Sequence, residues 1–292
     1  MERTIVSFDY AIKNILREKA NFGVLSGFLS ELLNKKIEVL EILESESNVK
    51  DEKDKTNKLD LKAKISDGEI AVFEIQASSQ IDFFQRILFG VSKAVVEQLY
   101  KKDPYEKIKK VYSIDIVYFE LGKGSDYIYH GFTEFKGIHN DDTLLFSPME
   151  KKYLPLRKAG ELFPEYYLIY PHRFDETIRS RFDEWVYVLK TSMLRSEFSA
   201  AGVQAAGEIL DEMRMTSGQR AEYEQFLKDE RIRESSFRTA ELKGEARGKA
   251  EGKAEGKAEG KAEVAKNLKN IGVPISQISQ ATGLTIEEIE KL

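Results

Sequence analysis

Two short runs of almost purely apolar residues, separated by an amphipathic segment of helical length, constrain the fold of this chain most strongly. The runs are Ile70–Ile75 and Val111–Phe119, and their composition is typical of strands that are buried on both faces. The segment between them carries an apolar stripe at helical spacing, formed by Phe84, Leu88, Val91, Val95 and Leu99. This pattern predicts an α/β fold in which helices flank a central mixed sheet.

Segments on either side extend this pattern. Apolar residues at helical spacing within residues 8–32 predict two helices, and Ile37–Leu43 predicts a strand. Leu59–Ile65 alternates between apolar and polar residues, as a strand with one buried face does. The predicted order over the first part of the chain is therefore α-(α)-β-β-β-α-β. Tyr127–Phe135 and Tyr166–Tyr170 predict further strands, and a helix follows with Ile178, Phe182, Trp185 and Leu189 on one face.

Composition divides the 292 residues into four parts. Residues 1–150 form the α/β core, and residues 151–243 form a mainly helical extension that completes or packs on it. Residues 244–263 repeat Gly-Lys-Ala-Glu tetrads. We expect a marginal helix or a flexible spacer there, because glycine costs about 1 kcal/mol relative to alanine in a helix. Residues 264–292 predict a small helical tail with helix-turn-helix-like spacing, in which Gly283 forms the turn and Thr285 caps the last helix.

The composition also excludes several classes of protein. The chain has no Cys, which excludes a disulfide scaffold, Cys-ligated metal and a thiol nucleophile, and fits a reducing compartment. We therefore expect a cytoplasmic protein. No apolar run approaches the 18 residues of a membrane span, so we expect no membrane partner. The net charge is −5, so any contact with nucleic acid needs a local basic patch.

Polar residues inside the strand pattern are the candidates for chemistry. Glu74 and Gln76 interrupt an otherwise apolar strand, and Asp60 lies on the polar face of the preceding one. A two-residue turn at Asp67-Gly68 would place Asp60 and Glu74 on different faces of the hairpin. A three-residue turn at Ser66-Asp67-Gly68, with Gly68 in the left-handed conformation, places them directly opposite each other. The position of the glycine favours the three-residue turn.

Two carboxylates on opposite residues of a hairpin repel unless a proton or a cation lies between them. All-oxygen ligands suit a hard divalent cation such as Mg²⁺, and the backbone carbonyl of Ile75 would add a ligand. Lys62 shares the face of Asp60 and is placed to steady a phosphate or an attacking water. Alternatively, Lys62, Lys64 or Arg86 neutralises the two acids, which then do no chemistry.

The sequence resembles the PD-(D/E)XK nuclease superfamily, in particular the PD-(D/E)XK family transposases or recombination-promoting nucleases. Four stretches carry the resemblance: FDYAIKNILREKANFGVLSGFLSELL, LDLKAKISDG with the first acid, FEIQ with the second, and FFQRILFGVSKAV. The likeness is densest over residues 5–120. It implies a restriction-endonuclease-like core and divalent-metal-dependent hydrolysis of DNA phosphodiester bonds.

The resemblance also implies roles for individual residues. Asp60 and Glu74 would hold Mg²⁺, or Mn²⁺ in its place, together with the Ile75 carbonyl. Gln76 stands where many members of the superfamily have Lys. Because Gln76 carries no charge, it would orient water or substrate only. Lys62 is then the candidate for the missing cation.

The implied substrate is DNA, and Lys64, Gln85 and Arg86 are expected to contact it. The alternative function is a catalytically degenerate nuclease fold that binds DNA or a protein partner. The predicted last helix is acidic and would repel phosphates. We therefore expect the tail to pack or to join copies of the chain into a homo-oligomer rather than to read DNA.

Overall fold

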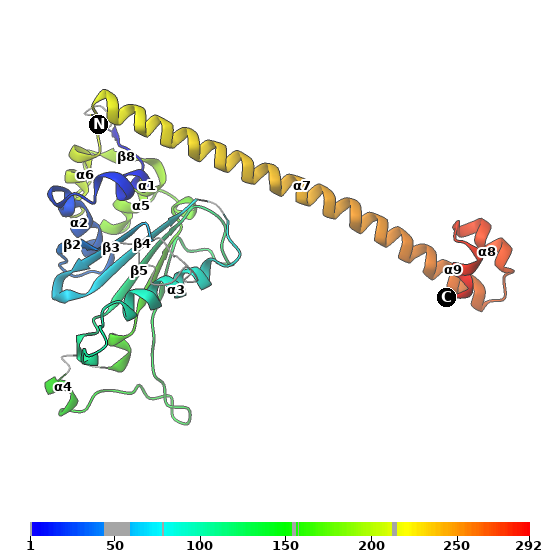
Figure 1. Cartoon of the computed structure of the whole chain (residues 1–292), viewed down its shortest axis with the longest axis horizontal. Helices are drawn as coiled ribbons and strands as arrows, with labels where there is room; N and C mark the ends of the chain where they lie inside the picture. Colours follow the sequence, from blue (N-terminus) through cyan, green and yellow to red (C-terminus); the bar gives the residue numbers. More distant parts are fainter. Residues whose placement is uncertain (1, 44–58, 78, 154–155, 157, 212–214) are drawn as a thin grey trace. The chain divides into compact units, whose positions relative to one another are not determined.

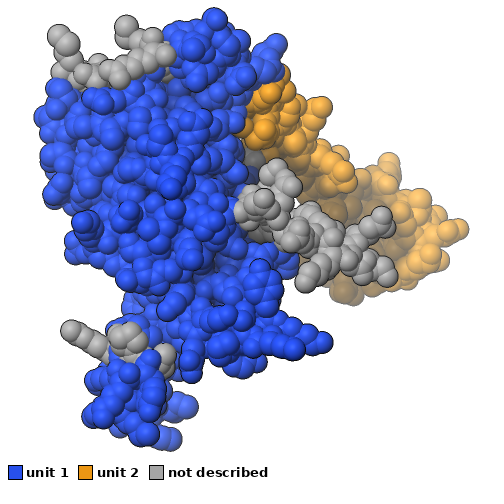
Figure 2. Space-filling model, turned by 60° about the vertical axis from the view of Figure 1, so that its left-hand side comes forward, with its two compact units in different colours: residues 1–228 blue, residues 229–292 orange. Residues whose placement is uncertain are grey.

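The computed structural model describes residues 2–43, 59–77, 79–153, 156, 158–211 and 215–292. The chain divides into two compact units, residues 1–228 and residues 229–292, which Figure 2 shows in different colours. We describe each unit by itself.

A six-stranded mixed sheet organises the first unit (Figure 1). Its strands are β2 (Val39–Leu43), β3 (Leu61–Ile65), β4 (Ile70–Gln76), β5 (Val111–Val117), β6 (Ile128–Gly131) and β7 (Glu165–Ile169). They lie in the order β2-β3-β4-β5-β7-β6, and β5 runs parallel to both β4 and β7, whereas the other neighbours are antiparallel. The predicted α/β fold with a mixed sheet is confirmed.

Helices cover the two faces of this sheet unequally. The larger core joins one face to residues of α1 (Phe8–Tyr10), a π-helical turn (Ala11–Ile15), α2 (Phe22–Leu32), α5 (Arg181–Thr191) and α6 (Val203–Ile209). The smaller core joins the other face to α3 (Phe83–Val96). This unit also contains the short helix α4 (Glu150–Tyr153) and a two-stranded ribbon of β1 (Glu2–Thr4) with β8 (Met193–Arg195). Side chains of each strand alternate between the two cores, so polar residues two apart share a face.

Helix α3 forms where the sequence predicts it, and Val91 of the predicted stripe is buried, but the first half of the helix buries a different stripe. Phe84 and Leu88, expected in the core, are 51% and 59% exposed, whereas Phe83 and Ile87 are buried. The two stripes differ by one residue, which is a rotation of about 100° around the helix. Because both stripes are apolar in this half of the helix, the periodicity does not distinguish them.

Helix α5 begins later than the apolar spacing predicts. The Ser180 hydroxyl accepts a hydrogen bond from the Asp183 amide, and the Asp183 carboxylate accepts one from the Ser180 amide. This capping box starts the helix at Arg181. Ile178 therefore precedes the helix, whereas Trp185 lies inside it and is fully buried.

The turn between β3 and β4 sets the register of the candidate site. Leu61 pairs with Phe73, and the Ile65 amide donates to the Glu69 carbonyl at 2.8 Å, which leaves three residues in the turn. Gly68 has φ +77°, as predicted, and Asp67 is also left-handed at φ 61°. Aspartate tolerates this conformation better than most residues. The three-residue turn is confirmed.

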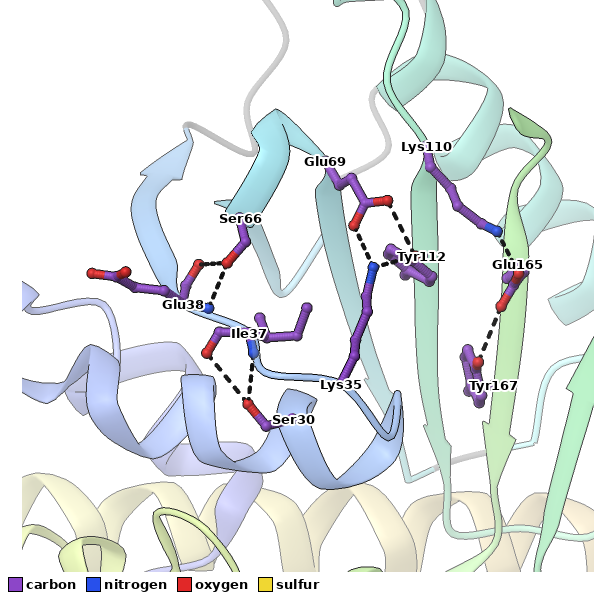
Figure 3. A network of polar contacts seen from close by, with 10 residues as sticks. All are labelled: Ser30, Lys35, Ile37, Glu38, Ser66, Glu69, Lys110, Tyr112, Glu165 and Tyr167. Atoms are coloured by element: carbon purple, nitrogen blue, oxygen red, sulfur yellow. Dashed lines mark hydrogen bonds and ion pairs between the residues drawn. The ribbon is translucent and has the colours of Figure 1, made fainter. Parts of the chain in front are cut away.

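A network of polar side chains fixes the amino ends of the parallel strands (Figure 3). Lys35 Nζ lies 2.7 Å from Glu69 Oε2 and 2.9 Å from the Tyr112 hydroxyl. Lys110 forms an ion pair with Glu165 at the start of β7. These contacts hold the hairpin turn, β5 and β7 together. The opposite edge of the sheet, where β4 and β5 end, contains the candidate site.

The second unit consists of helices. Helix α7 (Ser217–Asn270) begins in the first unit, continues through the repeat of residues 244–263, and is followed by α8 (Ile275–Thr282) and α9 (Ile286–Glu290). Gly283 is left-handed and Thr285 caps α9, as predicted. Ala265, Ile278 and Ile289 form the small core of this unit. None of the described helices combines the length and apolar character needed to cross a bilayer.

Candidate functional site

The two predicted acids meet at the edge of the sheet where β4 ends. Glu74 is 4% exposed, and Asp60, which directly precedes β3, lies opposite it in the register of the hairpin. Asp60 Oδ2 accepts a hydrogen bond from the Ile75 amide at 2.7 Å. The β3–β4 ladder ends at the pair of Leu61 with Phe73. The Asp60 carboxylate therefore takes the place that a strand carbonyl would occupy on Ile75.

The environment of Glu74 disfavours its charge. Burial, the main cause, and the Asp60 carboxylate raise the pKa of Glu74, whereas Arg86, Lys13 and a hydrogen bond from the Asp60 backbone lower it, and the resulting pKa is about 7. Arg86, on α3, forms an ion pair with Glu74 Oε1. Both oxygens of Glu74 are buried, and a carboxylate that pairs with one Arg keeps lone pairs for a further ligand. Two crowded carboxylates with spare lone pairs fit the ligand requirements of a hard divalent cation.

A third acid, Asp115, lies beside Glu74. The parallel register of β4 and β5 pairs these two residues, so both side chains face α3. Asp115 is 1% exposed, and burial is the main cause that raises its pKa well above the ordinary value, to which the Glu74 charge adds. Burial thus favours the neutral form. Sequence reasoning missed Asp115, although an acid inside the apolar strand Val111–Val117 is the same signal that identified Glu74.

Charged residues of the N-terminal segment surround Asp60. Lys13 Nζ lies 2.6 Å from Asp9 Oδ1 and 3.6 Å from Asp60 Oδ1. Arg17 donates a hydrogen bond to the backbone carbonyl of Asp60. Sequence reasoning missed all three residues, although Asp9, Lys13 and Arg17 recur every four positions and form the polar stripe of a helical segment.

The comparison with protein families identifies the family of this chain. A profile described as the PD-(D/E)XK nuclease family transposase matches residues 6–240. The chain belongs to this family. A search of the curated proteins and a search of the solved structures each find no match to the chain. Family membership makes the chain a nuclease-type protein, for which DNA is the implied substrate and divalent metals are the general cofactors.

Gln76 and Lys62, the two further residues predicted to act at the site, have different partners in the structure. Gln76 is the last residue of β4, and its carbonyl accepts a hydrogen bond from the Tyr118 amide at 3.0 Å. Lys62 is 7% exposed, and its ammonium lies 2.6 Å from Glu97 Oε2. The charges that lower the pKa of Glu74 come from Arg86 and Lys13, not from Lys62.

The three residues expected to contact DNA lie at different places in the structure. Arg86 turns toward the acids, because it pairs with Glu74 and its Nη1 donates to Gln80 Oε1 at 3.2 Å. Gln85, the preceding residue of α3, is exposed. Lys64 is exposed on β3 and lines a cleft of about 360 Å³. Its other charged lining residues are Lys62, Lys107 and Lys109, with the acids Glu41 and Glu97, so lysines outnumber acids in this basic cleft.

The number of acids limits how the PD-(D/E)XK site can hold an ion. The described residues contain no group of three or more His, Cys, Asp or Glu side chains close enough to hold a metal. A cation between Asp60 and Glu74 would therefore need a backbone carbonyl and water as further ligands, which Mg²⁺ readily accepts.

Proposed function

We propose that the protein is a divalent-metal-dependent DNA endonuclease that binds Mg²⁺, or Mn²⁺, through Asp60, Glu74 and the Ile75 carbonyl. The observation that carries the proposal is the placement of Asp60 opposite Glu74, with both Glu74 oxygens buried. The amide and carbonyl of one strand residue point to the same side. Since the Ile75 amide points to Asp60, its carbonyl faces the same edge.

The residues around the acids would each contribute to hydrolysis. A divalent cation at this position would lower the pKa of a bound water and neutralise charge on the phosphate. Gln76 lies two residues beyond Glu74 on the same face of β4, where its amide is suited to orient water or substrate. Asp115, in its neutral form, adds no second buried charge beside Glu74, and Arg86 holds the Glu74 carboxylate in place.

The basic cleft supplies the DNA contacts of this proposal. Side-chain carbons of Lys64 and Lys109 both lie near Gly68, at 4.0 Å and 3.7 Å from the position of an added Cβ. Lys64 lies four residues beyond Asp60 on the same face of β3, which is about 13 Å along a strand. The backbone of one DNA substrate can therefore contact the acids and the cleft together. Lys62 belongs to this cleft, and exposed Gln85 to the surface of α3.

Cleavage of supercoiled plasmid tests the enzymatic part. The wild type is assayed with Mg²⁺, with Mn²⁺ and with EDTA, beside Asp60→Ala, Glu74→Ala and the matched control Glu106→Gln, which changes an exposed acid. We expect metal-dependent nicking that both site variants abolish and the control retains. Nicking that survives in either site variant would place the reaction elsewhere.

The DNA contacts are tested by salt dependence. Replacing Lys64 or Lys109 by Gln removes one cation, so each variant should bind DNA more weakly and reduce the slope of log affinity against log salt by about 1. Lys123→Gln, at an exposed loop position, is the control. Unchanged slopes in the cleft variants would exclude this cleft as a DNA contact.

One observation favours the degenerate nuclease as the second candidate function. Glu74 is paired with Arg86, and Asp60 lies beside Lys13, so each acid has a cation near it without metal. A wild type that binds DNA, cleaves nothing and is not stabilised by Mg²⁺ would establish this function. For either function we propose a role in DNA recombination, which the description of the family as a transposase supports, and a cytoplasmic location.

A further inference from the structure

We infer that Lys13 supplies the positive charge that the Glu74-Ile75-Gln76 motif lacks at the active site. The inference rests on the proposed nuclease function. The strand position two residues beyond the second acid carries the neutral Gln76, and the ammonium of Lys62 is paired with Glu97. Lys13 comes from a distant part of the sequence and lies near Asp60 Oδ1, whereas the Ile75 amide donates to Oδ2.

The two distances at Lys13 define how it is held. Its ammonium is in hydrogen-bonding range of Asp9, at 2.6 Å, but 3.6 Å from Asp60 Oδ1 is beyond that range. Asp60 Oδ2 is already taken by the Ile75 amide. Lys13 therefore lies beside Asp60 Oδ1, the oxygen that is left to bind a cation, but does not form a hydrogen bond with it. Asp9 is the positioning residue that keeps the ammonium there.

The N-terminal segment is anchored well enough to fix this position. Phe8 and Ile12 are buried in the larger core on one side of the segment. The Leu16 amide donates to the Ala11 carbonyl at 2.8 Å, which closes a π-helical turn around Lys13. Such turns are often found at functional sites. The Lys13 side chain is 31% exposed, so a bound phosphate can reach it.

The second cation at the site is placed differently. Arg86 contacts Glu74 directly and is tied to Gln80, so its charge serves the carboxylate. During hydrolysis the water oxygen bonds to phosphorus, one phosphorus–oxygen ester bond breaks, and a proton passes through solvent from the water to the leaving oxygen. Negative charge builds up on the phosphate oxygens in this step. The Lys13 ammonium remains protonated and stabilises that charge.

Three variants of the full chain test the inference. Lys13→Met removes the charge at similar volume, Lys13→Arg keeps it, and Lys19→Met makes the same change at an exposed position of the same segment. Single-turnover cleavage at saturating DNA and metal is measured beside the affinity for Mg²⁺ without DNA. We expect Lys13→Met to cleave about 10²–10³-fold more slowly, the typical loss for one preorganised group. Lys13→Arg should recover at least a tenth of the rate.

The affinity for Mg²⁺ distinguishes a catalytic role of Lys13 from a structural one, because in Lys13→Met the affinity should rise while the cleavage rate falls. The Lys13 ammonium repels a Mg²⁺ ion bound at Asp60, and Lys13→Met removes this repulsion. Lys13→Met should therefore bind Mg²⁺ several-fold more tightly than Lys19→Met. Slow cleavage with tighter metal binding supports the inference. Cleavage by Lys13→Met within threefold of the wild type overturns it and leaves the nuclease proposal intact. If the wild type cleaves nothing, the nuclease proposal fails. Unchanged Mg²⁺ affinity in Lys13→Met then also removes Lys13 from the site.

Discussion

Replacing Glu74 by Gln should make the metal-free protein more stable above neutral pH, although it removes a proposed catalytic residue. The pKa of Glu74 rises from 4.5 to about 7 in the folded protein, with burial as the main cause. The folded state therefore binds this proton more tightly than the unfolded chain does. The stabilisation that the bound proton gives the folded state is complete below pH 4.5 and is lost as the pH rises through 7.

The size of the effect follows from the shift. A difference of about 2.5 pKa units corresponds to about 3 kcal/mol at about 1.4 kcal/mol per unit. The Glu74 side chain is 5% exposed, so solvent screens little of this energy. Glutamine is isosteric with the protonated acid and does not ionise. At pH 8 in EDTA, the free energy of unfolding of Glu74→Gln should exceed that of the wild type by up to about 3 kcal/mol. This difference in stability should vanish near pH 4.5.

Urea unfolding followed by tryptophan fluorescence measures this difference, because Trp185 is the single tryptophan and is buried in the first unit. Glu184→Gln is the matched control. Glu184 is also buried, but its carboxylate accepts hydrogen bonds from the amides of Ser199 and Ala200 at 2.7 Å and 2.6 Å. Replacing Glu184 by Gln should therefore destabilise the protein, because it disrupts these hydrogen bonds. Saturating Mg²⁺ should stabilise the wild type and have no such effect on Glu74→Gln.

The reasoning is refuted if Glu74→Gln destabilises the protein equally at pH 5 and pH 8. That result would show that Glu74 is ionised throughout and that its pair with Arg86 stabilises the fold. Glu74 would then belong to the structural alternative, in which the acids are neutralised by cations and do no chemistry.

Three further predictions concern other parts of the chain. Asp115→Asn should change stability at pH 7 by less than about 1 kcal/mol in the same unfolding assay, because burial already favours the neutral carboxyl. Gly27→Ala should destabilise the first unit by about 3 kcal/mol or more, since its Cβ would lie 2.3 Å from the Ala201 carbonyl oxygen. Gly23→Ala, on the same helix with open space around it, is the control and should not destabilise. Replacing the five repeat glycines of 244–263 by Ala should stabilise α7 by up to about 1 kcal/mol each, seen as slower proteolysis there. Faster proteolysis would contradict the helical assignment.

The hairpin that carries Asp60 and Glu74 was predictable because its determinants are local. Strand periodicity, a three-residue turn and one left-handed glycine are sufficient to place Asp60 opposite Glu74, and the structure has this register. The capped turn of the tail at Thr285 was predictable for the same reason. The buried stripe of α3 was not, because Phe83 and Phe84 offer apolar faces of equal quality and only the sheet selects between them.

The sequence by itself determined the strands, the turn and the pair of acids, because each depends on residues within about twenty positions of one another. The tertiary structure alone decided what surrounds that pair. Asp115 lies beside Glu74 only because β5 is the parallel neighbour of β4, and Lys13 lies beside Asp60 only because the N-terminal segment packs at that edge of the sheet. Long-range packing sets these neighbours and therefore sets the charge of the site, which no local pattern encodes.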